Sequence, residues 1–313
     1  MDRNSLAVGN CLAGSLKEAA AIEIGPLGAT FTACDGAVRV AVTGAARQAE
    51  IAGSQLPLNQ TALIAAGETL KLGAARNGVF SYLAVEGGIR GEQVFGSLSV
   101  NARSGIGSPY PRALRARDEL TVGTATLMPH EWQLDIVEQA KGPVRVVMGP
   151  QDDEFGDARD VFLNSDWVIS VTSDRMGYRL EGPMIAHAKG HNIVSDGTVN
   201  GSIQVPGSGQ PIVLLMDRGT TGGYPKIATV ISADLGRFAQ MPAGSKIRFA
   251  AISVKDAQDE ARRVAIFIAS LPGRLRAAGN SNLNLDELQS ANVAGAAVNA
   301  IDTVTWQTLP TSE

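Results

Sequence analysis

Ionisable and amide side chains gather in three polar stretches of this 313-residue sequence, SDRMGYRLEGP (173–183), GSIQVPGSGQP (201–211) and DRGTTGGYPKIATV (217–230). They supply seven candidate site residues: Arg175, Tyr178, Arg179, Gln204, Asp217, Tyr224 and Lys226. Guanidinium and amide groups match planar anionic or urea-like groups, a lysine ammonium stabilises an oxyanion, and a carboxylate orients or removes a proton. The pattern therefore fits a binding site for such a group, and it fits cross-strand charge pairing with glycine turns equally well.

Common nucleotide-binding, hydrolase and metal motifs are absent from the sequence. In the glycine-rich stretch the lysine spacing differs from a phosphate loop, and Pro225 lacks the backbone donor that a phosphate nest needs. GIGSPY (105–110) begins like a dinucleotide fingerprint but ends in tyrosine, and there is no G-x-S-x-G. His187 and His191 are spaced as in a helical zinc motif, but Gly190 disfavours a helix and the motif's glutamate is missing. A polar loop without metal is predicted there.

Composition restricts the class of protein. Hydrophobic residues make up 44% and charged residues 19%, which is ordinary for a globular chain with a sizeable core. With 27 basic and 31 acidic residues the net charge is −4, so no basic surface for nucleic acid is expected. The two cysteines, Cys11 and Cys34, fit a reducing compartment, and no membrane span or secretory signal is recognisable. We expect a cytoplasmic protein that acts on small molecules.

The elements that must position the candidate residues are mostly short strands. Glycine-punctuated runs with β-type patterning occur in a first block at 21–34, 38–45, 61–67, 68–74 and 79–89. A second block has such runs at 144–150, 161–172, 176–185, 201–207, 211–218, 224–232 and 246–253. Many short strands predict a barrel or sandwich rather than a doubly wound fold. The interruption at 129–144 predicts a domain boundary between the two blocks.

Helical spacing marks four segments, at 4–21, 234–241, 254–271 and 285–297. Asn4 or Ser5 is expected to cap the first of these helices, and Asp234 the second. A turn followed by an alternating strand recurs at 65–73, 115–123 and 241–250, and we interpret these as equivalent strand entries in related β units. The fold class predicted from the residues is therefore mainly β with flanking helices.

Several long stretches resemble the biotin-dependent carboxyltransferase family. In the second block they are MGPQDDEF (148–155), SDRMGYRLEGP, residues 195–235 and FAQMPAGSKIRF (238–249). SYLAVEGGI, VFGSLSVNARSGIG and ALRARDEL agree in the first block. The family includes the C subunit of 5-oxoprolinase, the so-called allophanate hydrolase subunit 2, the kinase-inhibitor antagonist KipA, and the carboxyltransferase half of urea carboxylase. The resemblance covers nearly the whole chain.

The resemblance implies two β-rich units, over 1–140 and 141–313, the second similar to a cyclophilin-like barrel and carrying C-terminal helices. It implies catalytic roles for Asp217, Tyr224 and Lys226. It also implies substrate-binding roles for the remaining candidates, which are Arg175, Tyr178, Arg179 and Gln204.

The resemblance also implies a hetero-oligomer with a companion, the B subunit, which is similar to allophanate hydrolase subunit 1. In the 5-oxoprolinase branch these two proteins, with a separate A subunit, open a cyclic amide at the expense of ATP. In the urea carboxylase branch the module transfers a carboxyl group from N-carboxybiotin to urea, and in the KipA branch it is a regulatory binding protein. We expect the first activity and keep the other two as alternatives.

The sequence departs from the family pattern in two respects. It has no biotinylation motif of the A-M-K-M type and no ATP-grasp-like segment, so ATP is expected to act through the complex. Biotin belongs only to the alternative activity and then to another chain. The family's opening V-Q-D-x-G-R-x-G-like motif is also missing, and Met1-Asp2 resembles the end of a later stretch. This predicts an N-terminal truncation relative to the family.

Overall fold

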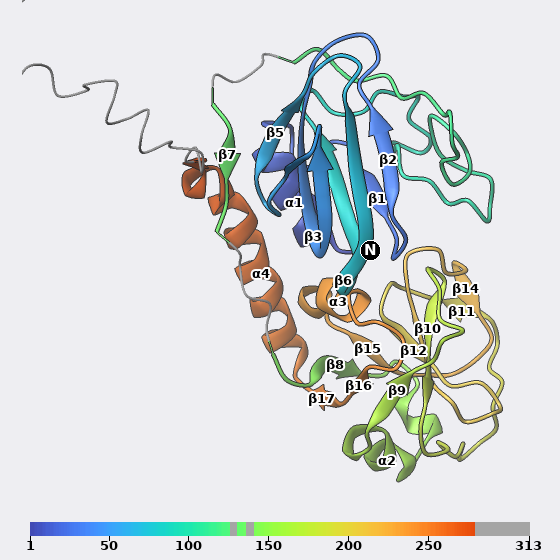
Figure 1. The fold of residues 1–313 in the computed structure, drawn as a ribbon. Coiled ribbons are helices and arrows are strands. Elements are labelled where there is room, and N and C mark those ends of the chain that lie inside the picture. The colour runs from blue at the N-terminus through green and yellow to red at the C-terminus, as the bar shows by residue number, and fades with distance from the viewer. Residues whose placement is uncertain (126–129, 136–140, 279–313) are drawn as a thin grey trace, which may run out of the picture. The chain divides into compact units, whose positions relative to one another are not determined.

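The computed structural model describes residues 1–125, 130–135 and 141–278, and Met1–Ala277 form one compact unit. Two main sheets with flanking helices make up this unit (Figure 1), so the predicted mainly β class is confirmed. The helix expected at 285–297 lies outside the described residues. The boundary between 1–140 and 141–313 remains a prediction.

The first sheet is antiparallel and is built around two long strands. Its strands are β1 (Ile22–Ile24), β2 (Ala29–Thr32), β3 (Val38–Ile51), β4 (Ser54–Gln55), β5 (Thr61–Ile64) and β6 (Thr69–Val85). The order is β1-β6-β3-β4, with β2 paired to β6 and β5 to β3. Two predicted runs are fused in β6, and the single run predicted at 21–34 is interrupted at Gly25-Pro26, because proline supplies no ladder donor. Buried leucines such as Leu70, Leu72 and Leu83 contribute to the core of this sheet.

The first helix, α1 (Arg3–Leu12), is shorter than predicted and has a different cap. The Asp2 carboxylate caps it by accepting the backbone N–H groups of Asn4 and Ser5, both at 3.1 Å. The prediction that Asn4 or Ser5 is the cap was therefore wrong. Gly14, with a φ of +63°, follows the end of the helix, where the left-handed conformation is easy only for glycine.

The second sheet has eight strands and is barrel-like, as predicted for the second β-rich part. In sheet order the strands are β16 (Lys246–Ile247), β9 (Trp167–Ile169), β10 (Gly177–Glu181), β13 (Ile212–Leu214), β12 (Ser202–Gln204), β15 (Lys226–Val230), β8 (Val144–Met148) and β17 (Phe249–Ala251). The pairs are antiparallel except for β17 with β8. Large buried side chains, including Trp167, Phe238 and Ile203, fill the core of this part.

One predicted strand is too long and another is wrong. In the run at 161–172 only β9 is a strand, whereas residues 161–164 belong to α2 (Ala158–Asn164), and the Phe162 carbonyl accepts a hydrogen bond from the Trp167 indole at 3.0 Å. The expected strand entry at 115–123 contains only an isolated bridge between Ile89 and Val122. The remaining short elements are η1 (Asp152–Glu154), η2 (Leu271–Arg274), and the pair β7 (Trp132–Gln133) and β18 (Arg276–Ala277).

The predicted helices at 234–241 and 254–271 are confirmed as α3 (Ser232–Ala239) and α4 (Val254–Ser270). Asp234 does not cap α3. Its fully buried carboxylate instead accepts hydrogen bonds from the guanidinium groups of Arg145 and Arg237, each at 2.6 Å. The helix begins two residues before Asp234, with Ile231 at the N-cap position, so this carboxylate lies inside the first turn, where its burial requires cationic partners. In the part of the chain that the structure describes, no helix is long and apolar enough to cross a membrane.

Gln240, directly after α3, connects the second part to the first sheet. Its Oε1 accepts the backbone N–H groups of Val79 and Phe80 at 3.0 and 2.9 Å. Its Nε2 donates to the Phe80 carbonyl at 2.8 Å and to Asp2 at 3.0 Å. One buried amide thus satisfies three backbone groups of β6 and tethers the helix to that strand.

Candidate functional site

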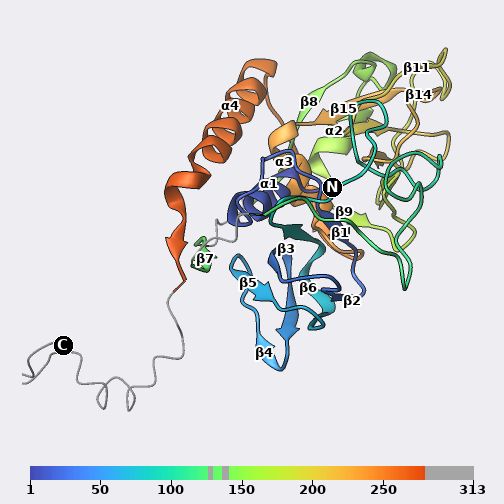
Figure 2. The ribbon, with the colours of Figure 1, turned by 90° about the horizontal axis from the view of Figure 1, so that it is seen from above.

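The stretch 217–230 connects β13 to β15 and forms a small two-stranded ribbon on the way. Within it β14 (Thr221–Gly222) pairs antiparallel with β11 (Asp196–Gly197), and Figure 2 shows these strands side by side. The interpretation of this stretch as a turn between two strands is confirmed. The ribbon brings Asp196 next to the beginning of β15, where Lys226 lies.

Lys226 is a buried lysine with one carboxylate partner. Its side chain is 2% exposed, and its Nζ donates to Asp196 Oδ2 at 2.8 Å, whereas the Asp196 side chain is 53% exposed. The hydrogen bond from Lys226, followed by the N–H of Gly197, lowers the pKa of the Asp196 carboxyl. Gln151 completes the arrangement: its Nε2 donates to Asp196 and its Oε1 accepts the Lys226 N–H, both at 3.1 Å. The ammonium group is therefore held beneath the surface by a carboxylate at the surface.

Gln204 lies on β12, next to Lys226 on β15, at a register shift between the two strands. Its amide is buried, and its Nε2 is 3.4 Å from the Tyr224 carbonyl oxygen, a long hydrogen bond. A Cβ at Gly222 would come within 2.3 Å of that Nε2, so a side chain at this position would displace the Gln204 amide. The Tyr224 side chain is exposed. Two donors, an ammonium and a primary amide, thus occupy neighbouring strands.

Arg175 and Asp217 form a second group. Asp174 shapes the turn before β10, since its Oδ1 accepts the N–H of Met176 at 2.8 Å. The Arg175 guanidinium then donates from Nε and Nη2 to the two oxygens of Asp217 at 2.9 and 3.0 Å. Its Nη1 donates to Glu23 on β1 of the first sheet. A carboxylate from β1 and one from the turn after β13 therefore bind the same guanidinium.

Tyr178 and Arg179 follow each other on β10 and point in opposite directions. Tyr178 is buried, and its hydroxyl donates to the Ala239 carbonyl at 2.7 Å while its ring packs on Phe238. Burial raises the pKa of this tyrosine well above its usual range. Arg179 is exposed. The structure brings neither side chain together with Lys226.

Three residues in these contacts were missed by sequence reasoning: Gln151, Asp196 and Glu23. The first two lie in MGPQDDEF and in the stretch 195–235, both of which carry the family resemblance, so those motifs could have pointed to them. Glu23 is a single acid within the apolar strand β1. A partly buried acid is stabilised by a cation, but nothing in the sequence identifies Arg175 as that cation.

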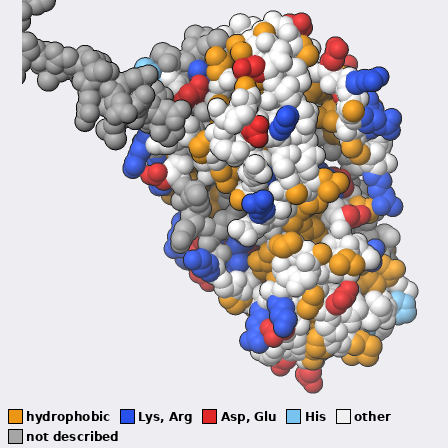
Figure 3. Space-filling model, in the orientation of Figure 1, with side chains coloured by type: hydrophobic (Ala, Val, Ile, Leu, Met, Phe, Trp, Pro, Cys, Tyr) orange, Lys and Arg blue, Asp and Glu red, His pale blue; other side chains and the backbone are white. Residues whose placement is uncertain are grey.

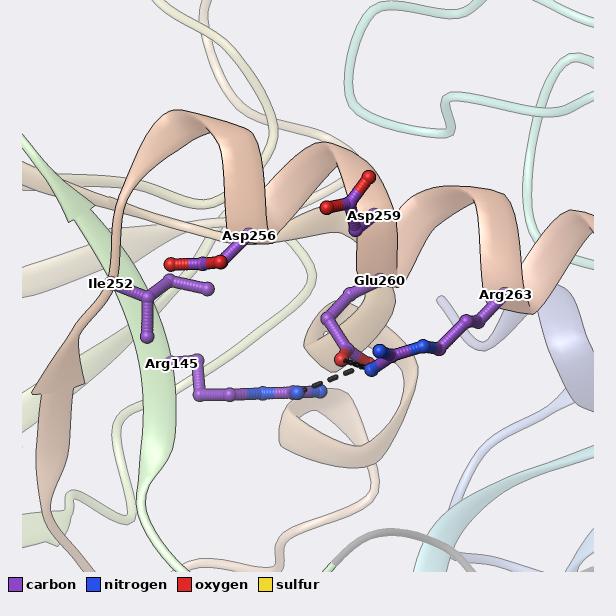
Figure 4. Close-up of a pocket in the computed structure, with 6 residues that line it drawn as sticks. All are labelled: Arg145, Ile252, Asp256, Asp259, Glu260 and Arg263. Atoms are coloured by element: carbon purple, nitrogen blue, oxygen red, sulfur yellow. Dashed lines mark hydrogen bonds and ion pairs between the residues drawn. The ribbon is translucent and has the colours of Figure 1, made fainter.

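A groove with a volume of about 260 Å³ lies along α4, and none of the seven candidates is in its lining. Figure 4 shows its residues, with Arg145 directed at Glu260; their Nη1 and Oε2 atoms are 3.1 Å apart. Because Arg145 also binds Asp234, these charges are compensated and stabilise the fold. Figure 3 shows charges of both signs scattered over the visible face, with no single basic patch.

Histidines and acids do not assemble into a metal site in the described ranges, where no cluster of three potential ligands occurs. His187 and His191 lie in a loop, as predicted, and the ring Nε2 of His187 is 2.9 Å from the Val205 carbonyl oxygen.

Comparisons with known proteins identify the family. The family model described as "Carboxyltransferase domain, subdomain A and B" matches residues 1–251. The chain is 37% identical over 270 residues to the C subunit of 5-oxoprolinase from Escherichia coli (strain K12), covering 84% of this chain and 86% of that protein. It is 34% identical over 269 residues to the C subunit of 5-oxoprolinase from Haemophilus influenzae (strain ATCC 51907 / DSM 11121 / KW20 / Rd), covering 86% of each.

A solved structure supports the fold. The K. lactis urea amidolyase superposes with a TM-score of 0.78 at 23% identity, over 87% of this chain and 18% of that one. This chain therefore belongs to the carboxyltransferase domain family that includes the C subunit of 5-oxoprolinase.

Proposed function

We propose that this chain is the C subunit of an ATP-dependent 5-oxoprolinase, which opens the cyclic amide 5-oxoproline to glutamate together with a B subunit and a separate A subunit. The observation that carries the proposal is the match to two 5-oxoprolinase C subunits, at 34% and 37% identity over about the same length of chain. The buried ammonium and amide donors on β15 and β12 support it chemically.

Opening a lactam places negative charge on the amide oxygen. Lys226 Nζ and Gln204 Nε2 are donors already fixed by Asp196 and by the Tyr224 carbonyl, so little reorganisation is needed when that charge develops. We assign them to the amide oxygen. We assign the exposed Tyr224 side chain to the opposite face of the ring.

Asp217 has a different role in this proposal. Both of its oxygens are occupied by Arg175, so it positions that guanidinium toward the substrate and is not the general base. Arg179, exposed on the same strand as Tyr178, contacts ligand only if the companion protein closes over it.

ATP is assigned to a companion protein of the complex. The glycine-rich stretch here contains Pro225 where a phosphate nest needs a donor, and Lys226 is paired with Asp196 rather than directed into that loop. Because this chain would bind the amide and a companion protein would bind ATP, we expect a hetero-oligomer. We place it in the cytoplasm, where the free cysteines Cys11 and Cys34 remain reduced.

Co-expression with the A and B subunits tests the proposal. The purified complex is expected to consume 5-oxoproline, hydrolyse ATP and release glutamate, and omission of this chain is expected to abolish glutamate formation. Absence of turnover in a stable three-subunit complex argues against the proposal.

Carboxyl transfer from carboxybiotin on another chain to urea is the second candidate function, and the family model's description as a carboxyltransferase domain favours it. Incubation of the complex with carboxybiotin and urea decides between the two, since only a carboxyltransferase consumes both.

A further inference from the structure

Arg218 is a partly buried cation for which the described part of the chain supplies no carboxylate. Its Nε is buried without a hydrogen-bond partner, and its Nη1 reaches only the Leu215 carbonyl, at 3.5 Å. The preceding residue, Asp217, does not compensate it, because Arg175 occupies both carboxylate oxygens. The residue as a whole is half-buried, although Nε itself is buried.

Two other buried arginines in the described residues are compensated. Arg237 also has a buried Nε without a partner, but its Nη2 binds Asp234 at 2.6 Å. Arg47 donates to four backbone carbonyls and to Ser81 Oγ. Burial without a partner is costly for a guanidinium, and it lowers the pKa of Arg218. Arg218, in the stretch 217–230, therefore differs from Arg237 and Arg47 in lacking a partner for its guanidinium, and a bound anion would supply one.

A second unpartnered polar group lies in the segment that faces this turn. Asn200 lies in a segment that is hydrogen-bonded to the chain before and after Arg218. The Gly201 N–H donates to the Leu214 carbonyl, and the Thr198 N–H donates to the Thr220 carbonyl. Its Oδ1 is buried without a partner, and its Nδ2 contacts only the Met216 sulfur, at 3.2 Å. Rotation of the amide by half a turn presents Nδ2 as a donor at the unpartnered position.

We infer that Arg218 and Asn200 bind the carboxylate of a small acidic ligand. A guanidinium and an amide provide directed donors and one positive charge, which suits a single carboxylate. Lys226 and Gln204 are assigned to an uncharged amide oxygen instead, so the two pairs of residues bind different ends of one molecule. That this acid is 5-oxoproline rests on the function proposed above.

The test compares an acidic lactam with its uncharged counterpart. In the three-subunit complex, R218Q is expected to raise KM for 5-oxoproline roughly 10- to 100-fold with little change in kcat. 2-Pyrrolidinone lacks the carboxylate and is expected to be a weaker substrate or inhibitor. Its KM or inhibition constant in R218Q is expected to stay within about 2-fold of the wild-type value. R218K keeps the positive charge but loses the planar guanidinium, so its KM for 5-oxoproline is expected to lie between those of wild type and R218Q. R262Q, an exposed arginine on α4, is the matched control and leaves KM unchanged.

A binding measurement separates this inference from the proposed function. The thermal midpoint of the full chain, and of its R218Q and N200A variants, is followed with 5-oxoproline, acetate and 2-pyrrolidinone. Carboxylates are expected to raise the midpoint of the unsubstituted chain and not that of R218Q. If the wild-type complex fails to turn over 5-oxoproline but this difference persists, only the proposed function is lost. Equal midpoint shifts in both proteins, or an equal KM change for charged and uncharged lactams, overturn the carboxylate site.

Discussion

Replacing Lys226 with methionine removes the buried ammonium and keeps most of the unbranched side chain. The lysine stem is 2% exposed, and methionine fills nearly the same volume, so packing is retained. The lost partner, Asp196, is half-exposed and becomes hydrated, and no charge is left buried. We therefore expect the free energy of unfolding to change by less than about 1.5 kcal/mol. The thermal midpoint should move by less than about 6 °C.

The same substitution is expected to lower kcat by about 100- to 1,000-fold, the usual loss when one donor to a developing oxyanion is removed. Glutamate formation by the three-subunit complex measures the rate, and urea denaturation of the isolated chain measures stability. Lys255→Met on α4, where the lysine is 82% exposed, is the matched control and should alter neither quantity. A kcat within about 3-fold of wild type, or a stability loss large enough to explain the activity loss, would refute the reasoning.

Three further predictions concern the contacts that hold the site in place. Asp234→Asn should cost about 3–5 kcal/mol in urea denaturation, because it breaks a buried ion pair. Burial alone would raise the pKa of Asp234, but its hydrogen bonds from the two arginines lower it. The ionised carboxylate therefore stabilises the fold above a pH of about 4, and this stabilisation is lost as the pH falls. The free energy of unfolding of the variant should thus depend less on pH in the acidic range. Gln240→Ala should cost about 2–5 kcal/mol by leaving buried groups of β6 unpaired, including both polar backbone groups of Phe80, and thermal unfolding will detect it. Tyr178→Phe should cost about 1–3 kcal/mol through the Ala239 carbonyl yet leave KM and kcat per folded complex unchanged, whereas a raised KM would support a substrate-binding role.

Local patterns were enough to predict much of the fold. Short, mostly apolar runs bounded by glycine and proline predicted the strands around the candidate site, including β12 and β15, because nearly every residue of both strands is buried. The amphipathic spacing of α4 predicted its extent to within a residue or two. The run at 161–172 misled because its apolar residues suit a strand, whereas Phe162 is buried from a short helix and Trp167 from the strand that follows.

The partners in the site could not be predicted in the same way. Lys226 was a candidate from its residue type, but its contacts lie 30 and 75 residues away, at Asp196 and Gln151. Such pairing depends on which strands are neighbours in the barrel-like sheet, and the local periodicity of the sequence does not determine the strand order. For the same reason a sequence pattern could not distinguish Asp217, whose oxygens are occupied, from a carboxylate free to act.

The shared guanidinium of Arg175 has a consequence for how the family can vary. Asp217, in the turn after β13, and Glu23, on β1, both bind this one cation, and Glu23 also accepts a hydrogen bond from the amino group of Met1. Loss of Arg175 would leave two carboxylates close together, and loss of either acid would leave the guanidinium undercompensated. We therefore expect the three positions to covary among homologues, so that a change at one is found only with a complementary change at another.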